Sequence, residues 1–352
     1  NYFKEINYEN ITFHIPNRFE DGYGISKCGI EKLPNLEKIN LFIIVDCGSN
    51  DTEAIEYLKS LGKKIIILDH HIVQNDPPNI EAFINIKQQS DESSLGYLCA
   101  TGLVFMFLVS LNNKFYSVHQ DTKKIQMINF LDLVALATVC DVMPLINLNR
   151  AFIKTGLKIM SNSQNNGLVS LMKALCVTNP SVTDIGFSIG PCLNAPGRLG
   201  SPKLSALLLT SIREDQDDLV ELANEIVALN TQRKLIVNYV FQQAIEQAYQ
   251  KKSNKFLLLY GNEWHEGIIG IVASKIKDIF DKPCCIVSFN KDKCIGKGSG
   301  RSTEYFDLGN ALITAKDFLI HYGGHKKAVG FSIDHEKIND FDLYMQTLLL
   351  NY

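Results

Sequence analysis

The triplet Asp69-His70-His71 places one carboxylate and two imidazoles next to one another. It follows Lys63–Ile67, whose unbroken apolar, mainly β-branched character is typical of a buried strand. In open α/β sheets, ligands bind outside the carboxyl ends of the strands. Carboxylate and imidazole together suit divalent metals such as manganese, iron or zinc. Taken alone, the triplet is equally consistent with a solvated polar turn.

Two further acids also end hydrophobic elements. The apolar strand predicted over Leu41–Val45 ends at Asp46, and the residues from 52 to 61 have helical spacing. A strand, helix and strand in this order predict a right-handed crossover and a parallel pair, with Asp46 and Asp69 at the same sheet edge. Asp141 ends an apolar helix predicted from 130 to 140. We therefore predict that Asp46, His70 and Asp141 hold a divalent ion.

Composition sets the class of protein. The 352 residues are 46% hydrophobic and 21% charged, which is typical of a folded chain of two or three domains. The net charge of −3 indicates that any nucleic-acid binding uses local basic patches. Nine cysteines without a CxxC pair favour free thiols in a reducing cytoplasm. The apolar run Leu103–Leu111 is too short to span a membrane, so no membrane partner is expected.

The chemistry-bearing segments need a scaffold of two α/β domains. We predict a parallel-sheet domain at 1–212, a long connecting helix at 213–252 with a break near Asn230-Thr231, and a smaller α/β domain at 253–352. Further strands are expected at 11–15, 83–86, 256–260, 283–289, 294–297 and 328–333, and helices at 267–280 and 308–319. Three glycine-rich segments, at 188–198, 296–302 and 323–325, are predicted loops or turns that approach a phosphate. Arg18, in a loop after the first of these strands, could hold a phosphate or a carboxylate, and on the residues alone a surface ion pair is favoured.

Several segments resemble motifs of a known family. Val45-Asp46-Cys47-Gly48-Ser49, Asp69-His70-His71 and Cys140-Asp141-Val142-Met143-Pro144 resemble three motifs of the DHH phosphoesterases. Within these, the resemblance is closest to the RecJ single-stranded-DNA exonucleases, and it spans nearly the whole chain. Later RecJ signatures resemble Asn194-Ala195-Pro196-Gly197-Arg198, His265–Gly270, Gly298-Ser299-Gly300-Arg301-Ser302 and Gly323-Gly324-His325.

The resemblance implies roles for individual residues. Asp46 would bridge two Mn²⁺ or Mg²⁺ ions, His70 and Asp141 would bind one of them, His71 would face the scissile phosphate, and Asp69 would orient a histidine. Residues implied to bind substrate phosphate are Asn194, Arg198, Lys297, Ser299, Arg301, Ser302, Gly324 and His325. The implied protein is a monomeric cytoplasmic 5′-to-3′ exonuclease on single-stranded DNA, with DHH and DHHA1 domains, acting with recombination and repair proteins.

The sequence departs from the family pattern at two places. Nothing in Asn1–Asn10 matches the family's Asp-rich first motif, and no OB-like domain follows the last motif. One metal position would then lack its usual ligands, so we expect residues 1–352 alone to bind single-stranded DNA weakly and to hydrolyse it poorly. The alternatives are a DHH/DHHA1 oligoribonuclease or nucleoside-bisphosphate phosphatase, and a catalytically inactive nucleic-acid-binding remnant.

Overall fold

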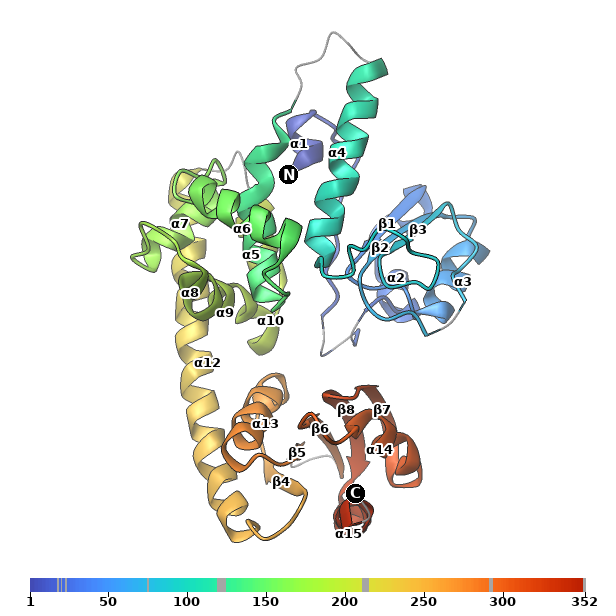
Figure 1. Ribbon diagram of the computed structural model, residues 1–352, viewed down its shortest axis with the longest axis vertical. Coiled ribbons are helices and arrows are strands. Elements are labelled where there is room, and N and C mark those ends of the chain that lie inside the picture. Colours follow the sequence, from blue (N-terminus) through green and yellow to red (C-terminus); the bar gives the residue numbers. More distant parts are fainter. Residues whose placement is uncertain are drawn as a thin grey trace. The chain divides into compact units, whose positions relative to one another are not determined.

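The computed structural model describes residues 1–17, 19, 21–22, 24–74, 76–118, 125–210, 215–290 and 294–350. Arg18 and the predicted start of the connecting helix at 213 lie outside these residues. The chain forms two compact units, Asn1–Ala228 and Leu229–Tyr352 (Figure 1). The predicted domain boundaries at 212 and 252 stay a prediction.

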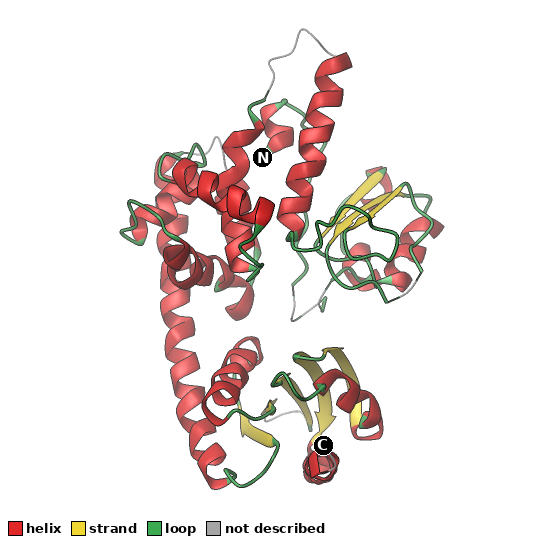
Figure 2. Cartoon of the chain, in the orientation of Figure 1, coloured by secondary structure: helices red, strands yellow, loops and turns green. Residues whose placement is uncertain are grey.

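The first unit combines a small sheet with many helices, as the secondary-structure colouring in Figure 2 shows. Its strands are β1 (Leu41–Val45), β2 (Lys64–Asp69) and β3 (Ala82–Asn85). Its helices are α1 (Tyr2–Glu5), α2 (Lys27–Glu31), α3 (Thr52–Ser60), α4 (Ala100–Val118), α5 (Leu131–Cys140), α6 (Asn147–Met160), α7 (Asn166–Ala174), α8 (Val182–Asp184), α9 (Gly190–Asn194), α10 (Pro196–Leu199) and α11 (Lys203–Thr210), with short 3₁₀ helices η1 (Leu36–Lys38) and η2 (Met127–Phe130) and the π-helix η3 (Ile185–Ile189). The helix α12 (Gln216–Gln250) begins in this unit and ends in the second one.

The sheet of the first unit is parallel, in the order β1-β2-β3. Val45 pairs with Leu68 and Asp69 with Asn85, so the three strands end at one edge. Isoleucines fill the face of the sheet that α3 covers: Ile65 and Ile67 are fully buried, and Ile55 and Leu58 of α3 pack into the same core. This confirms the predicted parallel pair.

The second unit contains a five-stranded mixed sheet in the order β4-β5-β6-β8-β7. The strands are β4 (Leu257–Asn262), β5 (Cys284–Phe289), β6 (Ile295–Arg301), β7 (Leu319–His325) and β8 (Ala328–Asp334). The other elements are α13 (Glu266–Phe280), α14 (Leu308–Thr314), α15 (Ile338–Leu350) and the turns η4 (Lys316–Phe318) and η5 (His335–Lys337). The helices α14 and α15 cover one face through a core that includes Leu308, Phe331 and Phe341, and α13 packs on the other face. The predicted α/β class holds for both units.

The segments at 296–302 and 323–325, predicted as loops or turns, lie mostly in the strands β6 and β7, and four further secondary-structure predictions are wrong. Residues 11–15 form no strand, and Ile11 and Phe13 lie 44% and 49% exposed. The helix α12 runs unbroken through Asn230, which is buried and accepts a hydrogen bond from Arg233. The helix expected over 308–319 ends at Thr314, and the unpredicted strand β7 follows.

The fourth error concerns residues 188–198, which are helical rather than a loop. Pro191 and Pro196 stand in first turns, where a helix needs no N–H group from them. At Gly190 an added Cβ would lie 2.5 Å from the Cys140 sulfur, so this glycine permits close packing against α5. Among the described residues, none of the helices combines the length and apolar character that crossing a membrane requires.

Candidate metal centre and phosphate-binding face

Asp46 is the first residue beyond β1, and its backbone is left-handed, with φ +64°. Its amide donates to the Leu68 carbonyl of β2 at 3.1 Å, which holds this conformation at the sheet edge. Aspartate tolerates positive φ better than most residues, and such outliers cluster at functional sites. The carboxylate is more than half exposed. The strand end therefore presents a charged oxygen ligand to solvent.

His70 lies between Asp46 and Asp141. Its Nδ1 lies 3.2 Å from the Leu98 carbonyl, which only accepts, so Nδ1 carries the hydrogen. The lone pair on Nε2 then faces Asp46 Oδ1 at 3.2 Å and Asp141 Oδ2 at 3.5 Å. A buried imidazole fixed in this tautomer is the form in which histidine binds metals. The structure brings together the two carboxylates and the imidazole that the sequence predicts as ligands.

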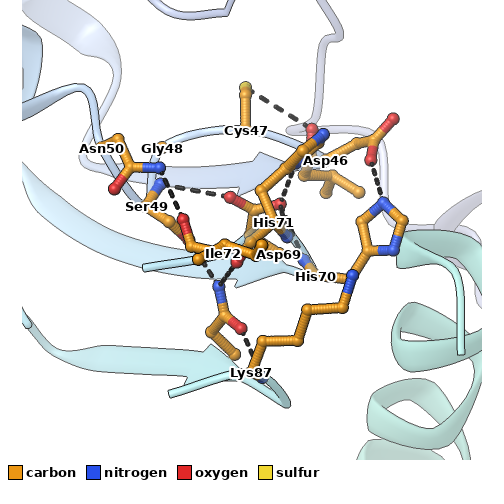
Figure 3. A network of polar contacts seen from close by, with 12 residues as sticks. Asp46, Cys47, Gly48, Ser49, Asn50, Asp69, His70, His71, Ile72 and Lys87 are labelled. Carbon is orange, nitrogen blue, oxygen red and sulfur yellow. Dashed lines mark hydrogen bonds and ion pairs between the residues drawn. The ribbon is translucent and has the colours of Figure 1, made fainter. Parts of the chain in front are cut away.

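His71 and Asp69 form a pair beside this group (Figure 3). His71 Nδ1 lies 2.7 Å from Asp69 Oδ1, and ligand atoms of Asp46, His70 and His71 all lie within 4.8 Å of one another. The Asp69 hydrogen bond raises the pKa of His71 above its ordinary value, against the opposing effect of burial. Burial favours a higher pKa of Asp69, but hydrogen bonds from His71 and Ser49 outweigh it and hold the pKa well below its usual range.

Two positioning residues were missed by the sequence reasoning. Asn85, at the end of β3, is 1% exposed and donates to Ser49 Oγ at 2.7 Å and to the His71 carbonyl at 2.9 Å. Ser49 in turn donates its amide to Asp69 at 3.2 Å. Asn85 therefore connects the loop after β1 to the loop after β2. Its place within an apolar strand is the one signal that the sequence offers.

The donors present at this edge fit a divalent ion. Burial raises the pKa of Asp141, and a bound cation would offset that effect by favouring its ionised form. Cys47 is a poor ligand, because burial raises its pKa to about 12 and its sulfur donates to the Val45 carbonyl. Two carboxylates with one imidazole suit manganese or magnesium better than a thiolate-seeking metal.

In the second unit, successive residues of β6 alternate between the two faces of the sheet. Gly296, Gly298 and Gly300 point into the core, where an added Cβ would lie 2.3 to 2.6 Å from Phe289, Phe331 or Cys285 side chains. These glycines therefore make room for the core, which corrects the expectation of a phosphate-binding loop. Lys297, Ser299 and Arg301 lie on the opposite face of the strand.

The face that carries Arg301 also carries residues of β8 and β7. Arg301 pairs with Ala328, which pairs with His325, so these three side chains share one face. Arg301 donates to Ser299 Oγ at 3.3 Å, and Lys297 donates to Ser332 Oγ at 3.1 Å. The structure thus brings Lys297, Ser299, Arg301 and His325 onto one sheet face.

Two glycines on this face have open space above them; the sequence motifs include Gly323 but not Gly330. Gly323 and Gly330 pair across β7 and β8, and an added Cβ would meet nothing within 4 Å at Gly323 and only the Gly298 carbonyl at 4.0 Å at Gly330. Neither has a left-handed φ. No packing in the described structure requires glycine here, unlike on the opposite face of β6. A bare strip of backbone thus lies among Lys297, Arg301 and His325.

The remaining predicted phosphate ligands lie elsewhere. Ser302 is buried and donates its hydroxyl to the Phe306 carbonyl at 2.8 Å, so it stabilises a turn. Gly324 has φ +135°, and a Cβ there would lie 2.3 Å from the Ala328 carbonyl oxygen. Asn194 and Arg198 belong to the first unit, in α9 and α10. Their roles as phosphate ligands stay predictions.

Comparisons with known proteins agree with both parts of the chain. Residues 1–138 match the model of the DHH family, N-terminal domain, and residues 253–349 match the DHHA1 domain. The single-stranded-DNA-specific exonuclease RecJ of Salmonella typhimurium is 32% identical over 95% of this chain and 60% of its own length. RecJ of Bacillus subtilis is 31% identical over 94% of this chain and 41% of its own. The chain thus spans between about two fifths and three fifths of the length of these two relatives.

Solved structures give the same result. A crystal structure of exonuclease RecJ bound to manganese superposes with a TM-score of 0.80 at 29% identity, covering 96% of this chain and 82% of that one. RecJ of Thermus thermophilus in complex with Mn²⁺ superposes with a TM-score of 0.79 at 29% identity, covering 92% of this chain and 47% of that one. A complex of RecJ from the same organism with Mg²⁺ gives a TM-score of 0.70 at 27% identity, covering 89% of this chain and 44% of that one. The two domain matches together cover well over half of the sequence, and the chain belongs to the DHH/DHHA1 family.

Proposed function

We propose that this chain is the catalytic part of a metal-dependent exonuclease that hydrolyses single-stranded DNA from the 5′ end. The observation that carries the proposal is the position of His70 Nε2, within 3.5 Å of carboxylate oxygens from both Asp46 and Asp141. Phosphodiester hydrolysis needs a charged centre that activates water and neutralises the phosphate. The similarity to RecJ exonucleases supports DNA as the substrate.

Asp46, His70 and Asp141 would hold the ion, and the metals named for the RecJ structures make it Mn²⁺ or Mg²⁺. Such an ion supplies Lewis-acid stabilisation of the phosphate and lowers the pKa of a bound water. The tautomer of His70, fixed by the Leu98 carbonyl, directs its lone pair to the ion. Asp46 stands between the sheet edge and solvent, where a carboxylate can bridge two ions.

His71 would act on the phosphate rather than on the ion. Its Nδ1–H donates to Asp69, so Nε2 is free to face the substrate. The raised pKa keeps this imidazole protonated to a higher pH than an isolated one, which suits contact with an anionic phosphate. Asp69, with its lowered pKa, stays ionised and orients the ring.

The basic sheet face of the second unit would bind substrate phosphate. Arg301 offers a planar fork for an anion, and Lys297 and His325 lie on the same face. These contacts carry no sequence information, which fits an enzyme that degrades strands of any sequence. We further propose that the protein acts as a cytoplasmic monomer in recombination and repair, in contact with other proteins of those processes.

The test measures ion binding and hydrolysis separately. Calorimetry with Mn²⁺ on Asp46→Asn and Asp141→Asn should show that the affinity for the ion falls by about 100-fold or more. Mutation of residues that only hydrogen-bond to metal ligands already lowers metal affinity by about 10- to 100-fold. Both variants should release nucleotides from 5′-labelled single-stranded DNA far more slowly than the unaltered chain. Asp76→Asn, an exposed acid of the same unit, is the matched control and should change neither quantity.

The substrate and the direction are tested with the unaltered chain. A 5′ label should appear in mononucleotides first, whereas a 3′ label should appear in a ladder of shortening strands. Cleavage of circular single-stranded DNA would contradict exonuclease action. A strong preference for di- and trinucleotide RNA would favour an oligoribonuclease. Unchanged Mn²⁺ affinity in both aspartate variants would remove the assigned metal centre.

A further inference from the structure

Helix α6 presents a row of cations that the proposed catalysis does not use. Arg150, Lys154 and Lys158 are exposed and follow one another at intervals of four residues, so they lie along one side of the helix. The helix contains no acidic residue. Over the part of the chain that the structure describes, these three side chains form no ion pair. In a chain of net charge −3, this is a local concentration of unneutralised positive charge.

The row is unfavourable for the helix itself. Like charges four residues apart repel one another on a helix surface. Arg150 lies in the first turn, where the helix dipole disfavours a cation, and only Lys158 in the last turn is favoured. A solvated helix face is the ordinary explanation for exposed lysines. It does not account for a row without acids, which points to an anionic partner.

The row is fixed in place relative to the metal centre. A Cβ at Gly156 would lie 2.2 Å from the Leu131 carbonyl oxygen of α5, so the two helices touch backbone to backbone. Buried Asn149 donates to the carbonyls of Tyr97 at 2.6 Å and Pro144 at 3.0 Å. Because Asp141 ends α5, the cations of α6 keep a constant position with respect to that carboxylate.

The segment between Asp141 and α6 exposes apolar side chains. Val142 is 87% exposed, Ile146 50% and Leu145 40%. Val142 has φ +53° because it takes the left-handed position that ends α5, where the Met143 amide donates to the Thr138 carbonyl at 3.1 Å. Exposed apolar groups beside a row of cations are the combination that single-stranded nucleic acids recognise, through bases and phosphates respectively.

We propose that Leu145, Ile146, Arg150, Lys154 and Lys158 form a track for the single strand that continues away from the scissile bond. This proposal rests on the proposed function, which places the scissile phosphodiester bond at the metal centre. The track is an additional DNA-binding surface, separate from the metal centre and from the second unit. Arg150 to Lys158 covers about 12 Å of helix, enough for more than one phosphate. Single-stranded DNA fits better than a duplex, because the apolar residues need unpaired bases.

The test compares a long single-stranded oligonucleotide with a dinucleotide. In the triple variant Arg150→Gln, Lys154→Gln, Lys158→Gln, binding of the long strand, measured by fluorescence anisotropy with Ca²⁺ at increasing KCl, should lose salt dependence. Each phosphate contact on a single strand contributes roughly 0.7 to the slope of log K against log salt. Removing three cations should therefore reduce the magnitude of this slope by about 2. Hydrolysis of the dinucleotide with Mn²⁺ should stay unchanged, since it is too short to reach α6.

A control removes the same charge elsewhere. Lys38, Lys64 and Lys173 are exposed lysines of the same unit outside α6, and their triple glutamine variant should keep the slope of the unaltered chain. An equal slope in both triple variants would overturn the track. Failure of the unaltered chain to hydrolyse the dinucleotide would count against the proposed catalysis alone, because the slope with Ca²⁺ is read without cleavage.

The apolar part of the track has its own test. Leu145→Ser with Ile146→Ser should weaken binding of a normal strand several-fold but leave binding of an abasic strand of equal length unchanged. Aliphatic side chains contact the apolar face that every base has, so the loss should be similar for different base compositions. Equal losses for the normal and the abasic strand would show that these residues do not contact bases. Far-ultraviolet circular dichroism of the double variant verifies that it folds.

Discussion

At the scale of single residues, the two neighbouring histidines differ in what fixes their rings. A backbone carbonyl holds His70, and the carboxylate of Asp69 holds His71. A carbonyl sets only the tautomer, whereas a carboxylate also changes the proton affinity of the ring. The two adjacent imidazoles can therefore have different roles: His70 offers a lone pair to a metal ion, and His71 offers a positive charge to a phosphate.

The pKa of His71 should depend on Asp69. In the metal-free protein, the Asp69→Asn variant should bring the pKa of His71 back down toward the ordinary 6.5, because the charged hydrogen bond that raises it is lost. Nuclear magnetic resonance titration of the imidazole measures this directly. Asp76→Asn is the control and should leave the titration unchanged. If Asp69→Asn also left it unchanged, the pair would not be formed in solution.

The same pair predicts a pH window for stability. A raised pKa of His71 stabilises the fold below pH 6.5, and this contribution is lost as pH rises through the folded value. The lowered pKa of Asp69 stabilises the fold above pH 3.8 and is lost as pH falls toward the folded value. The contribution of the pair is thus greatest between these two limits.

The sequence predicts Asp46, His70 and Asp141 because Asp46 and Asp141 directly follow apolar runs and His70 stands one residue further on, after Asp69. Asn85 and Ser49 were not predictable in the same way. Their importance comes from the register of β2 against β3 and from the path of the loop after β1. Such contacts depend on which strands become neighbours, and no spacing within one strand encodes that.

At the scale of elements, the predictions succeed where one residue class dominates. The isoleucine-rich strands β1 and β2 were found, whereas β6 was cut short because alternate glycines resemble a loop. The glycines of β6 are strand residues that accommodate phenylalanines of the core. The helices between 182 and 199 were missed because glycine and proline are read as breakers unless the packing that admits them is known.

Two glycine-to-alanine substitutions in the second sheet, each adding one methyl group, test which face of the sheet is packed. Gly298→Ala should destabilise the protein by about 1–3 kcal/mol, because the new Cβ would lie 2.3 Å from the ring of Phe331. Gly330→Ala should leave stability unchanged or raise it by up to about 1 kcal/mol, because space is free and alanine costs less chain entropy. Urea unfolding measures both free energies.

Binding should follow the opposite pattern to stability. Gly330→Ala places a methyl group on the bare strip beside Arg301 and should weaken binding of a nucleoside monophosphate, while inorganic phosphate binds as before. Titration calorimetry with both ligands measures the two affinities. A nucleotide affinity equal to that of the unaltered chain would mean that the strip does not contact the substrate.

At the scale of the whole molecule, each unit has a hydrophobic core of its own. Phe256, Phe331 and Phe341 lie in the core of the second unit, and Ile55 and Leu168 lie in cores of the first. Length and composition predict two or three domains but not where one core ends, since α12 contributes buried residues on both sides of the division.

Two units without a shared core predict two unfolding transitions. Scanning calorimetry should resolve both transitions. Mn²⁺ at 100 times its dissociation constant should raise the unfolding free energy of the first unit by about 2.7 kcal/mol, and so its transition temperature, and should leave the transition of the second unit unchanged. EDTA should reverse the shift. Hydrogen exchange assigns each transition, since amides of β2 and of β5 report on different units. A single transition that moves as a whole with Mn²⁺ would contradict independent cores.

The carbonyl of Leu98 that holds His70 belongs to the backbone, and this has a consequence for mutational robustness. Any residue at position 98 keeps this carbonyl, because its carbon is bonded to the backbone nitrogen of Cys99 and not to the Leu98 side chain. Random mutagenesis should therefore rarely yield, at position 98, loss-of-function alleles that act by releasing the His70 ring. The Leu98 amide donates to the Leu95 carbonyl at 2.8 Å, so the position of the peptide depends on the turn from Leu95 to Leu98. Alleles that misdirect His70 should therefore accumulate in that turn, at residues that never touch the ring.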